Sequence, residues 1–219
     1  MVNMRSEYVW YACYGSNLNK KRFLLYILGG PLEGTGRIHP GCSNKELPNR
    51  ESTITIPFEL YFSKKSKFWE NMAISFVKSK RDKSARTLCR LYLVSEEQFI
   101  EIMIQENDKN PSYMKPEIDF QLTMKTGVST IGNKDDFLWY GKHLYIGEKE
   151  GFPIFSFTAK WADDTIECEK PGKKYLKTII NGIKESFDLS HDEIFSYLKN
   201  KCGIKSEISE VELYELIKS

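Results

Sequence analysis

A short loop is the first part of this sequence that could do chemistry. Residues 14–17 read Tyr-Gly-Ser-Asn and follow an aromatic, β-branched run, which predicts a tight turn between a buried strand and a helix. Gly15 permits close approach to the backbone, and the start of a helix leaves amide hydrogens unpaired. Such a loop can bind a carboxylate or a carbonyl oxygen. Turns of this composition are also common structural joints, so both interpretations stay open.

The second candidate is Glu106, near the end of a predicted helix. Ser95 and Gln98 have capping-box spacing, and apolar residues share one helical face with the glutamate: Phe99, Ile102 and Met103. This face places the carboxylate partly in the core, where desolvation raises the pKa of a carboxyl group toward the value that a general base needs. A glutamate in the last helical turn can instead rotate into solvent.

The elements that must position these residues are strands and helices in mixed order. Aromatic and β-branched runs predict strands at 8–13, 52–62, 72–77, 87–94, 121–124, 137–144 and 153–158. Helical spacing predicts a first helix capped by Ser16 or Asn17 and stopped at Gly29, a second ending near Asn107, and a third at 174–187. Residues 34–51 follow neither period and predict an irregular surface excursion.

The C-terminal segment carries its own helix signals. Ser190 and Ser206 are candidate caps of two short helices, the first ending at Gly203. Apolar residues are dense in 204–219, which favours docking of this segment on the core over docking on a second chain.

Composition narrows the class of protein. The 219 residues are 41% hydrophobic and 28% charged, as expected for one principal globular domain. The 32 Lys and Arg nearly balance the 30 Asp and Glu, so no global field predicts binding to nucleic acid or to an anionic membrane. A basic run in 78–90 could bind nucleic acid, but a charged hairpin tip is usually a solvated turn.

The cysteines and the N-terminus predict the cellular compartment of the protein. The five cysteines include no CxxC pair, which fits neither a disulfide framework nor a zinc ribbon and predicts a reducing compartment: Cys13, Cys42, Cys89, Cys168 and Cys202. The N-terminus lacks a signal-peptide pattern, and no apolar run approaches the ~20 residues of a membrane span. We therefore expect a soluble cytoplasmic protein. The three histidines show no metal-ligand spacing, and we expect no metal site.

Residues 11–18, Tyr-Ala-Cys-Tyr-Gly-Ser-Asn-Leu, resemble the opening strand and glycine loop of the gamma-glutamylcyclotransferase family. In that family a later helix ends in Gln-Glu, the glutamate being the proton acceptor, and Gln105-Glu106 match this pair. Tyr113 matches a pocket tyrosine seven positions on. The family's pattern opening a further helix is similar to Pro171, Tyr175, Ile179 and Gly182, so the resemblance covers about residues 8–185.

The resemblance implies an α+β fold with a mixed, mostly antiparallel β-barrel or sheet and flanking helices. The catalytic domain would span 1–187, with 188–219 as a helical extension packed on it. Glu106 would be the catalytic residue, and no cofactor is implied. The implied substrate contacts are Tyr11, Tyr14, Gly15, Ser16, Asn17, Leu18, Tyr113 and Tyr175.

The activity implied is the cyclisation of a γ-glutamyl group to 5-oxoproline with release of an amine or amino acid. The expected partner is a small γ-glutamyl molecule, such as glutathione, with no nucleic acid or membrane, and the chain would be a monomer or homodimer. Four departures from the family pattern bear on pocket shape and activity: Asn71, Met72, Cys89 and Phe157. The alternative is a non-catalytic small-molecule or partner-binding protein on the same fold.

Overall fold

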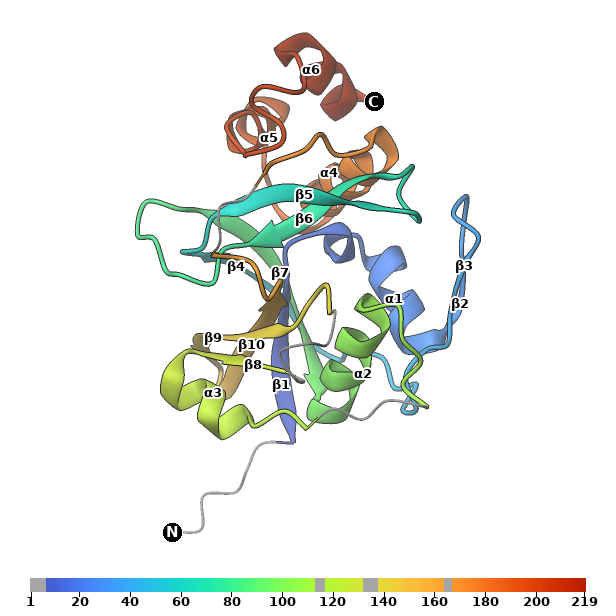
Figure 1. Cartoon of the computed structure of the whole chain (residues 1–219), viewed down its shortest axis with the longest axis vertical. Helices are drawn as coiled ribbons and strands as arrows, with labels where there is room; N and C mark the ends of the chain where they lie inside the picture. Colours follow the sequence, from blue (N-terminus) through green and yellow to red (C-terminus); the bar gives the residue numbers. More distant parts are fainter. Residues whose placement is uncertain (1–6, 113–116, 132–137, 164–166) are drawn as a thin grey trace.

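The computed structural model describes residues 7–112, 117–131, 138–163 and 167–219. Its largest sheet has the strand order β4-β7-β1-β10-β9-β8 (Figure 1). The strands, in that order, are Glu51–Ile56, Thr87–Ser95, Tyr8–Cys13, Phe152–Thr158, Lys142–Lys149 and Val128–Thr130. Neighbouring strands are antiparallel except β1 and β10, which are parallel. The predicted mixed, mostly antiparallel α+β fold is therefore confirmed.

Two hairpins stand beside this sheet. One joins β2 (Gly30–Leu32) to β3 (Arg37–His39), and the other joins β5 (Leu60–Ser66) to β6 (Met72–Val77). The six-stranded sheet ends at β4 on one side and β8 on the other, so the strand pairings of the described ranges do not close a barrel.

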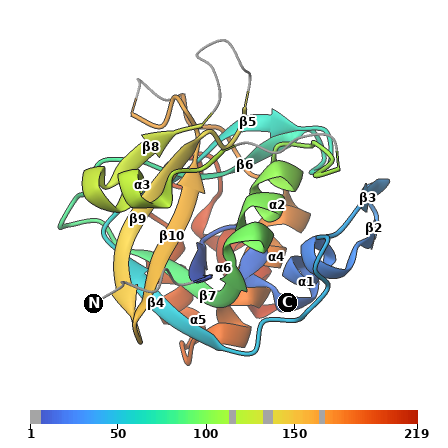
Figure 2. The same ribbon diagram turned by 90° about the horizontal axis from the view of Figure 1, so that it is seen from below.

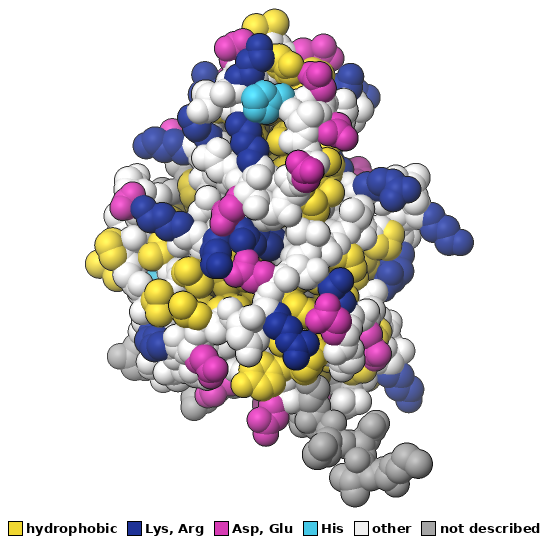
Figure 3. Space-filling view, turned by 180° about the vertical axis from the view of Figure 1, so that it is seen from behind, with side chains coloured by type: hydrophobic (Ala, Val, Ile, Leu, Met, Phe, Trp, Pro, Cys, Tyr) yellow, Lys and Arg dark blue, Asp and Glu magenta, His cyan; other side chains and the backbone are white. Residues whose placement is uncertain are grey.

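Helices cover the sheet unevenly. The short turn η1 (Ser16–Leu18) precedes six α-helices: α1 (Lys20–Leu28), α2 (Glu96–Glu106), α3 (Phe120–Thr126), α4 (Lys173–Ser186), α5 (His191–Leu198) and α6 (Glu210–Lys218). Figure 2 shows α1, α2 and α4 gathered to one side of β9 and β10. In Figure 1, α5 and α6 lie at the end of the molecule opposite to α3. Acidic and basic side chains are interspersed over the face seen in Figure 3.

Strand β1 is the centre of the sheet and feeds the candidate loop. All its residues after Tyr8 are buried, because β7 and β10 flank it and α2 packs on it. The hydrophobic core continues from here into the C-terminal helices, whose fully buried residues are Ile194, Leu198 and Ile217. One continuous core therefore connects the candidate loop to the end of the chain.

The capping box of α2 is confirmed. The Gln98 backbone N–H donates to Ser95 Oγ, and the Ser95 N–H donates to the Gln98 side chain, each at 3.1 Å. The first helix differs from the prediction, since Asn19 caps it by accepting from the Arg22 N–H at 3.0 Å. Ser16 and Asn17 cannot serve as its cap because they form the separate turn η1.

Several predicted boundaries were wrong. Residues 121–124 lie in helix α3, because Asp119 caps its start and Gly127, in the left-handed conformation, ends it. The run 52–62 splits into β4 and β5, which belong to different sheets. Residues 34–51 contain β3, and they bury His39 and Cys42 instead of lying wholly on the surface.

The C-terminal segment also differs in detail. Ser190 caps α5 as predicted, but the helix ends at Leu198 rather than at Gly203. Ser209, not Ser206, caps α6, since its hydroxyl accepts from the Glu212 N–H at 3.1 Å.

Two cysteines form a disulfide, against expectation. Cys168 and Cys202 are bonded across a separation of 34 residues, whereas Cys13, Cys42 and Cys89 are free and buried. The pairing was missed because it depends on folding: the Phe62 N–H donates to the Cys202 carbonyl and the Phe62 carbonyl accepts from the Glu169 N–H, which brings the two segments together at one residue of β5. Disulfides are uncommon in reducing compartments, so the cysteines do not support that inference. Within the described ranges, no helix has the length and apolarity to cross a membrane.

Candidate active site

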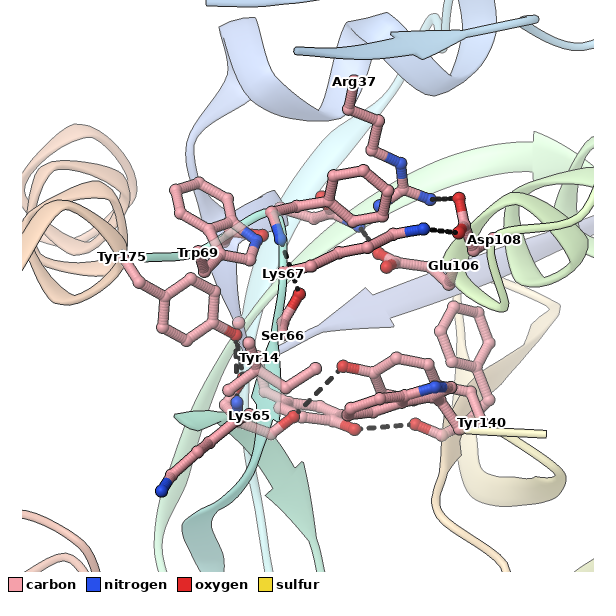
Figure 4. A pocket seen from close by; sticks show the side chains of 18 of the residues that line it. Tyr14, Arg37, Lys65, Ser66, Lys67, Trp69, Glu106, Asp108, Tyr140 and Tyr175 are labelled. Carbon is pink, nitrogen blue, oxygen red and sulfur yellow. Dashed lines mark hydrogen bonds and ion pairs between the residues drawn. The ribbon is translucent and has the colours of Figure 1, made fainter. Parts of the chain in front are cut away.

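A cavity of about 330 Å³ lies where the loop after β1, the end of α2, the β5–β6 hairpin and α4 meet (Figure 4). Seven of the residues selected from the sequence line it: Tyr11, Tyr14, Gly15, Ser16, Asn17, Glu106 and Tyr175. Tyr11 and Tyr175 are 164 positions apart in the sequence, so tertiary folding brings these residues together.

Two selected residues stand outside this group. Leu18 does not line the cavity: its side chain is buried in the core, its amide donates to the Gly15 carbonyl at 3.0 Å, and its carbonyl accepts from Arg90 at 3.0 Å. Tyr113 lies outside the described residues.

Close packing explains the glycine of the loop. A Cβ atom at Gly15 would stand 2.5 Å from Ser75 Oγ and 3.2 Å from the Tyr175 hydroxyl. The N–H groups of Leu18 and Asn19 are used within η1, but the first N–H groups of such a turn have no partner inside it. The loop can therefore present backbone donors to a ligand, from residues 15–17 rather than from Leu18.

Glu106 is held at the cavity wall by the loop itself. Its side chain is half-buried, and Asn17 Nδ2 donates to Glu106 Oε1 at 2.7 Å. The same amide nitrogen lies 3.2 Å from the Tyr11 hydroxyl. The Asn17 side-chain oxygen, Oδ1, is buried and has no hydrogen-bond partner among the described residues. A donor group of a ligand beside Glu106 would satisfy it.

A polar chain extends from Glu106 away from the cavity. Burial raises the pKa of Tyr26, and the neighbouring Glu106 carboxylate adds to that rise. Arg22 Nη2 donates to the Tyr26 hydroxyl at 2.8 Å. Tyr26 is thus a neutral phenol between the Glu106 carboxylate and the Arg22 guanidinium. Hydrogen bonds in such a chain favour one orientation of the Glu106 side chain.

The tyrosines of the cavity act as hydrogen-bonding groups. Tyr14 donates to the Phe157 carbonyl at 2.8 Å, and Tyr140 donates to the Ser75 carbonyl at 3.3 Å. Burial raises the pKa of each, and it raises the pKa of Tyr175 to about 12. They stay protonated near neutral pH, which leaves Glu106 and Asp108 as the acidic side chains of the described lining.

Helix α4 carries Tyr175 and packs closely against the loop at Gly182. A Cβ atom at Gly182 would overlap the backbone of Leu18 and Asn19, so α4 and the loop touch directly. Tyr175, two turns earlier, accepts from the Ser75 N–H at 3.0 Å and packs edge-on against Trp69 at 4.9 Å. The contact between α4 and the loop therefore determines how far the Tyr175 side chain extends into the cavity.

The rim of the cavity is charged. Asp108 lies 3.3 Å from Lys67 Nζ and 4.0 Å from Arg37 Nη2, and Figure 4 shows both cations directed toward it. The Arg37 guanidinium also lies over the Phe68 ring at 4.8 Å. Sequence reasoning missed Arg37, Lys67 and Ser75, because none belongs to a helical face or a motif. Asp108 stands two residues after Glu106 in the sequence.

The residues that depart from the family pattern fall into two groups. Asn71 and Phe157 line the cavity, and Phe157 stacks on Tyr11 at 5.1 Å. Met72 and Cys89 do not line it. Asn107, which follows the candidate base, donates to the Met103 and Tyr140 carbonyls at 2.9 and 3.1 Å and so joins the end of α2 to the cavity wall.

The histidines take no part in this site. Burial lowers the pKa of both His39 and His143 to about 3, so both are neutral at pH 7. His191 is exposed at the start of α5. Across the described ranges, no group of three or more His, Cys, Asp or Glu side chains could hold a metal ion.

Comparison with known proteins gives few relatives. No protein-family model matches the chain. It is 30% identical to histone deacetylase 5 of Arabidopsis thaliana over 203 residues, which are 87% of this chain and only 30% of that protein's length. Among solved structures it is similar to an uncharacterized protein from Homo sapiens (16% identity, TM-score 0.49, 98% and 100% of the two chains). It is also similar to a gamma-glutamyl cyclotransferase (16% identity, TM-score 0.47, 97% and 99%).

Proposed function

We propose that this protein is a gamma-glutamylcyclotransferase-like enzyme that releases 5-oxoproline from a small γ-glutamyl compound. The observation that carries the proposal is the 2.7 Å hydrogen bond between Asn17 and Glu106. It joins the residue expected to be the base to the loop expected to bind substrate, inside a cavity of the size that small ligands occupy. We also propose that the enzyme is a monomer or homodimer, with 188–219 as an extension of the catalytic domain.

The reaction needs one base and no cofactor. The α-nitrogen of the γ-glutamyl group attacks the γ-carbonyl carbon, a new C–N bond closes the ring, and the bond to the leaving nitrogen breaks. Glu106 accepts a proton from the α-ammonium, which frees the nucleophile, and returns it to the leaving nitrogen; the second proton that the attacking nitrogen loses passes to the released amine, which leaves as an ammonium. No covalent bond forms with the enzyme.

The substrate is oriented by the groups around the base. An α-ammonium beside Glu106 would also satisfy the buried side-chain oxygen of Asn17, Oδ1. The backbone N–H groups of residues 15–17 could hold the substrate and offset the charge that develops on the carbonyl oxygen. Confinement in the folded conformer supplies proximity between the amine and the γ-carbonyl.

A panel of γ-glutamyl compounds tests the proposal. The protein is incubated with γ-Glu-Ala, glutathione and a γ-glutamylamine, and 5-oxoproline and the released amine are measured by mass spectrometry. We expect the two products in equal amounts from at least one compound. Binding in a calorimetric titration without product from any compound would instead support the non-catalytic alternative.

A further inference from the structure

A second, larger hollow adjoins the candidate active site. This groove has a volume of about 630 Å³ and lies between α1, the β2–β3 hairpin and α4. Lys67, Phe68 and Trp69 line both the groove and the catalytic cavity. A substrate whose leaving group passes over this segment therefore continues into the groove.

The groove is basic. Five cations line it, against two carboxylates: Lys21, Arg22, Lys67, Lys174 and Lys177, against Glu33 and Glu70. Both carboxylates are engaged, since Glu33 pairs with Lys21 at 3.5 Å and Glu70 accepts from the Lys174 backbone N–H at 3.3 Å. Lys174 and Lys177 are three residues apart, hence on one face of α4, and neither forms an ion pair with a described residue.

Arg22 supplies an independent indication of an anion. Its side chain is only 4% exposed, lies over the Tyr26 ring at 4.6 Å, and forms no ion pair within the described ranges. Only Nη2 is hydrogen-bonded, while Nε and Nη1 are buried without a partner among the described residues. A buried guanidinium with unpartnered N–H groups is unfavourable, and the Glu106 carboxylate reaches Arg22 only through the Tyr26 hydroxyl, so an anion in the adjoining groove would stabilise this arrangement.

We propose that the leaving group is an acidic peptide. The substrate would carry a γ-linked glutamate at its amino end, in the catalytic cavity, and carboxylates on the following residues, in the groove beside Lys174 and Lys177. This inference rests on the proposed function and adds the class of leaving group. Glutamate or aspartate side chains match the surplus of positive charge, and a peptide supplies the length that a single amino acid lacks.

Two peptides of equal length test the charge preference. The substrates are γ-Glu-Ala-Glu-Glu and γ-Glu-Ala-Gln-Gln, and 5-oxoproline release gives kcat/KM for each. We expect the acidic peptide to be favoured about tenfold at low salt, since a few exposed ion pairs of modest strength act together, and we expect the preference to shrink as salt is added. Equal kcat/KM values for the two peptides would overturn the proposal.

A charge-reversal variant assigns the preference to the groove. In Lys174→Glu/Lys177→Glu the preference should invert toward the neutral peptide. The control is Lys80→Glu/Lys83→Glu, in the β6–β7 loop, which changes the net charge equally but lines neither hollow and should keep the preference. An unchanged preference in the groove variant, or the same inversion in the control, contradicts the assignment.

The dipeptide γ-Glu-Ala separates two kinds of failure. If it yields 5-oxoproline while the tetrapeptides show no charge preference, the acidic-peptide inference is wrong and the proposed function stands. If no γ-glutamyl compound yields 5-oxoproline, the proposed function is wrong and the inference falls with it.

Discussion

The side chains of the candidate site are positioned by specific contacts more than by deep burial. Glu106 is only half-buried, yet Asn17 fixes one of its oxygens and Tyr26 flanks it. Glu96 and Glu97, in the first turn of α2, lie at the opposite end of the helix, about 14 Å away at 1.5 Å per residue. Of these three carboxylates Glu106 lines the cavity, and it is the one that we propose as the base.

Replacing Glu106 by Gln should abolish catalysis while preserving ligand binding. The amide keeps the oxygen that accepts from Asn17 but cannot accept a proton, so 5-oxoproline formation should fall about 10²–10⁴-fold. Glu97→Gln, an exposed position on the same helix, is the matched control and should leave the rate within about twofold. Turnover retained in Glu106→Gln would assign the base elsewhere, with Asp108 the next candidate.

Adding a side chain at Gly15 should close the binding loop. A Cβ atom there collides with Ser75 Oγ at 2.5 Å, and the branched side chain of Gly15→Val extends this obstruction. We expect most of the fold to remain and calorimetric binding of a γ-glutamyl ligand to disappear. In a Ser75→Ala background, the smaller change Gly15→Ala should destabilise the protein less than it does alone, because the collision is relieved. Undiminished binding by Gly15→Val would contradict the role of the loop.

Among the elements, α4 determines how the site is assembled. Its glycine contact with the loop fixes the approach of Tyr175 from a distant part of the chain. The hairpin of β5 and β6 supplies Ser75, which is hydrogen-bonded to Tyr175, so both elements contribute to this part of the cavity wall.

Gly182→Ala should loosen this assembly. The added methyl group overlaps the backbone of Leu18 and Asn19, and such overpacking destabilises by about 1–3 kcal/mol. Because α4 must shift, Tyr175 moves away from Ser75 and ligand affinity should fall as well. Chemical denaturation and calorimetry measure the two effects, and Asn181→Ala, exposed on the same helix, is the control for stability. Unchanged stability and affinity would show that α4 does not press on the loop.

The disulfide should stabilise the packing of the segment 167–171 against the segment that joins α5 to α6. Closing a loop of 34 residues contributes about 3–4 kcal/mol by loss of chain entropy in the unfolded state. Cys168→Ser/Cys202→Ser should therefore lower the free energy of unfolding by about that amount. A reductant should destabilise the wild type and leave the variant unaffected, and equal responses of the two proteins would argue against the bond.

For the whole molecule, buried neutral histidines should make stability depend on pH. Burial lowers the pKa of His39 and His143 to about 3, below the ordinary value of 6.5. As pH falls from 6.5 toward 3, the unfolded chain binds protons that the native protein excludes. The free energy of unfolding should therefore fall with pH, by about 1.4 kcal/mol per pH unit for each histidine.

Denaturant unfolding between pH 7 and pH 4.5 measures this dependence. His143 is surrounded by aromatic rings, with Phe99 and Phe155 each at 4.9 Å, so His143→Phe should fit its site and remove about half of the pH slope. His191→Phe, at an exposed position, should leave the slope unchanged. An unaltered slope in His143→Phe would show that other groups cause the pH dependence.

The sequence by itself determined the features that depend on neighbours a few residues apart. The capping box at Ser95 and the apolar face of α2 are patterns of three and four residues, and they correctly placed Glu106 at the end of a helix. The aromatic run of β1 is likewise local. Local hydrogen bonds and side-chain periodicity leave direct traces in sequence, so these elements could be predicted without the fold.

Only the tertiary structure decided which distant side chains surround the site. Ser75 is hydrogen-bonded to Tyr175, 100 residues away in the sequence, Lys67 forms an ion pair with Asp108, and Cys168 is bonded to Cys202. No periodic pattern in the sequence predicts any of these pairs. Even a local assignment failed where context was needed, since residues 121–124 have strand-forming composition but lie between the caps of α3. Such contacts arise from the packing of whole elements, whose relative placement depends on the summed burial of the core and not on any short stretch of sequence.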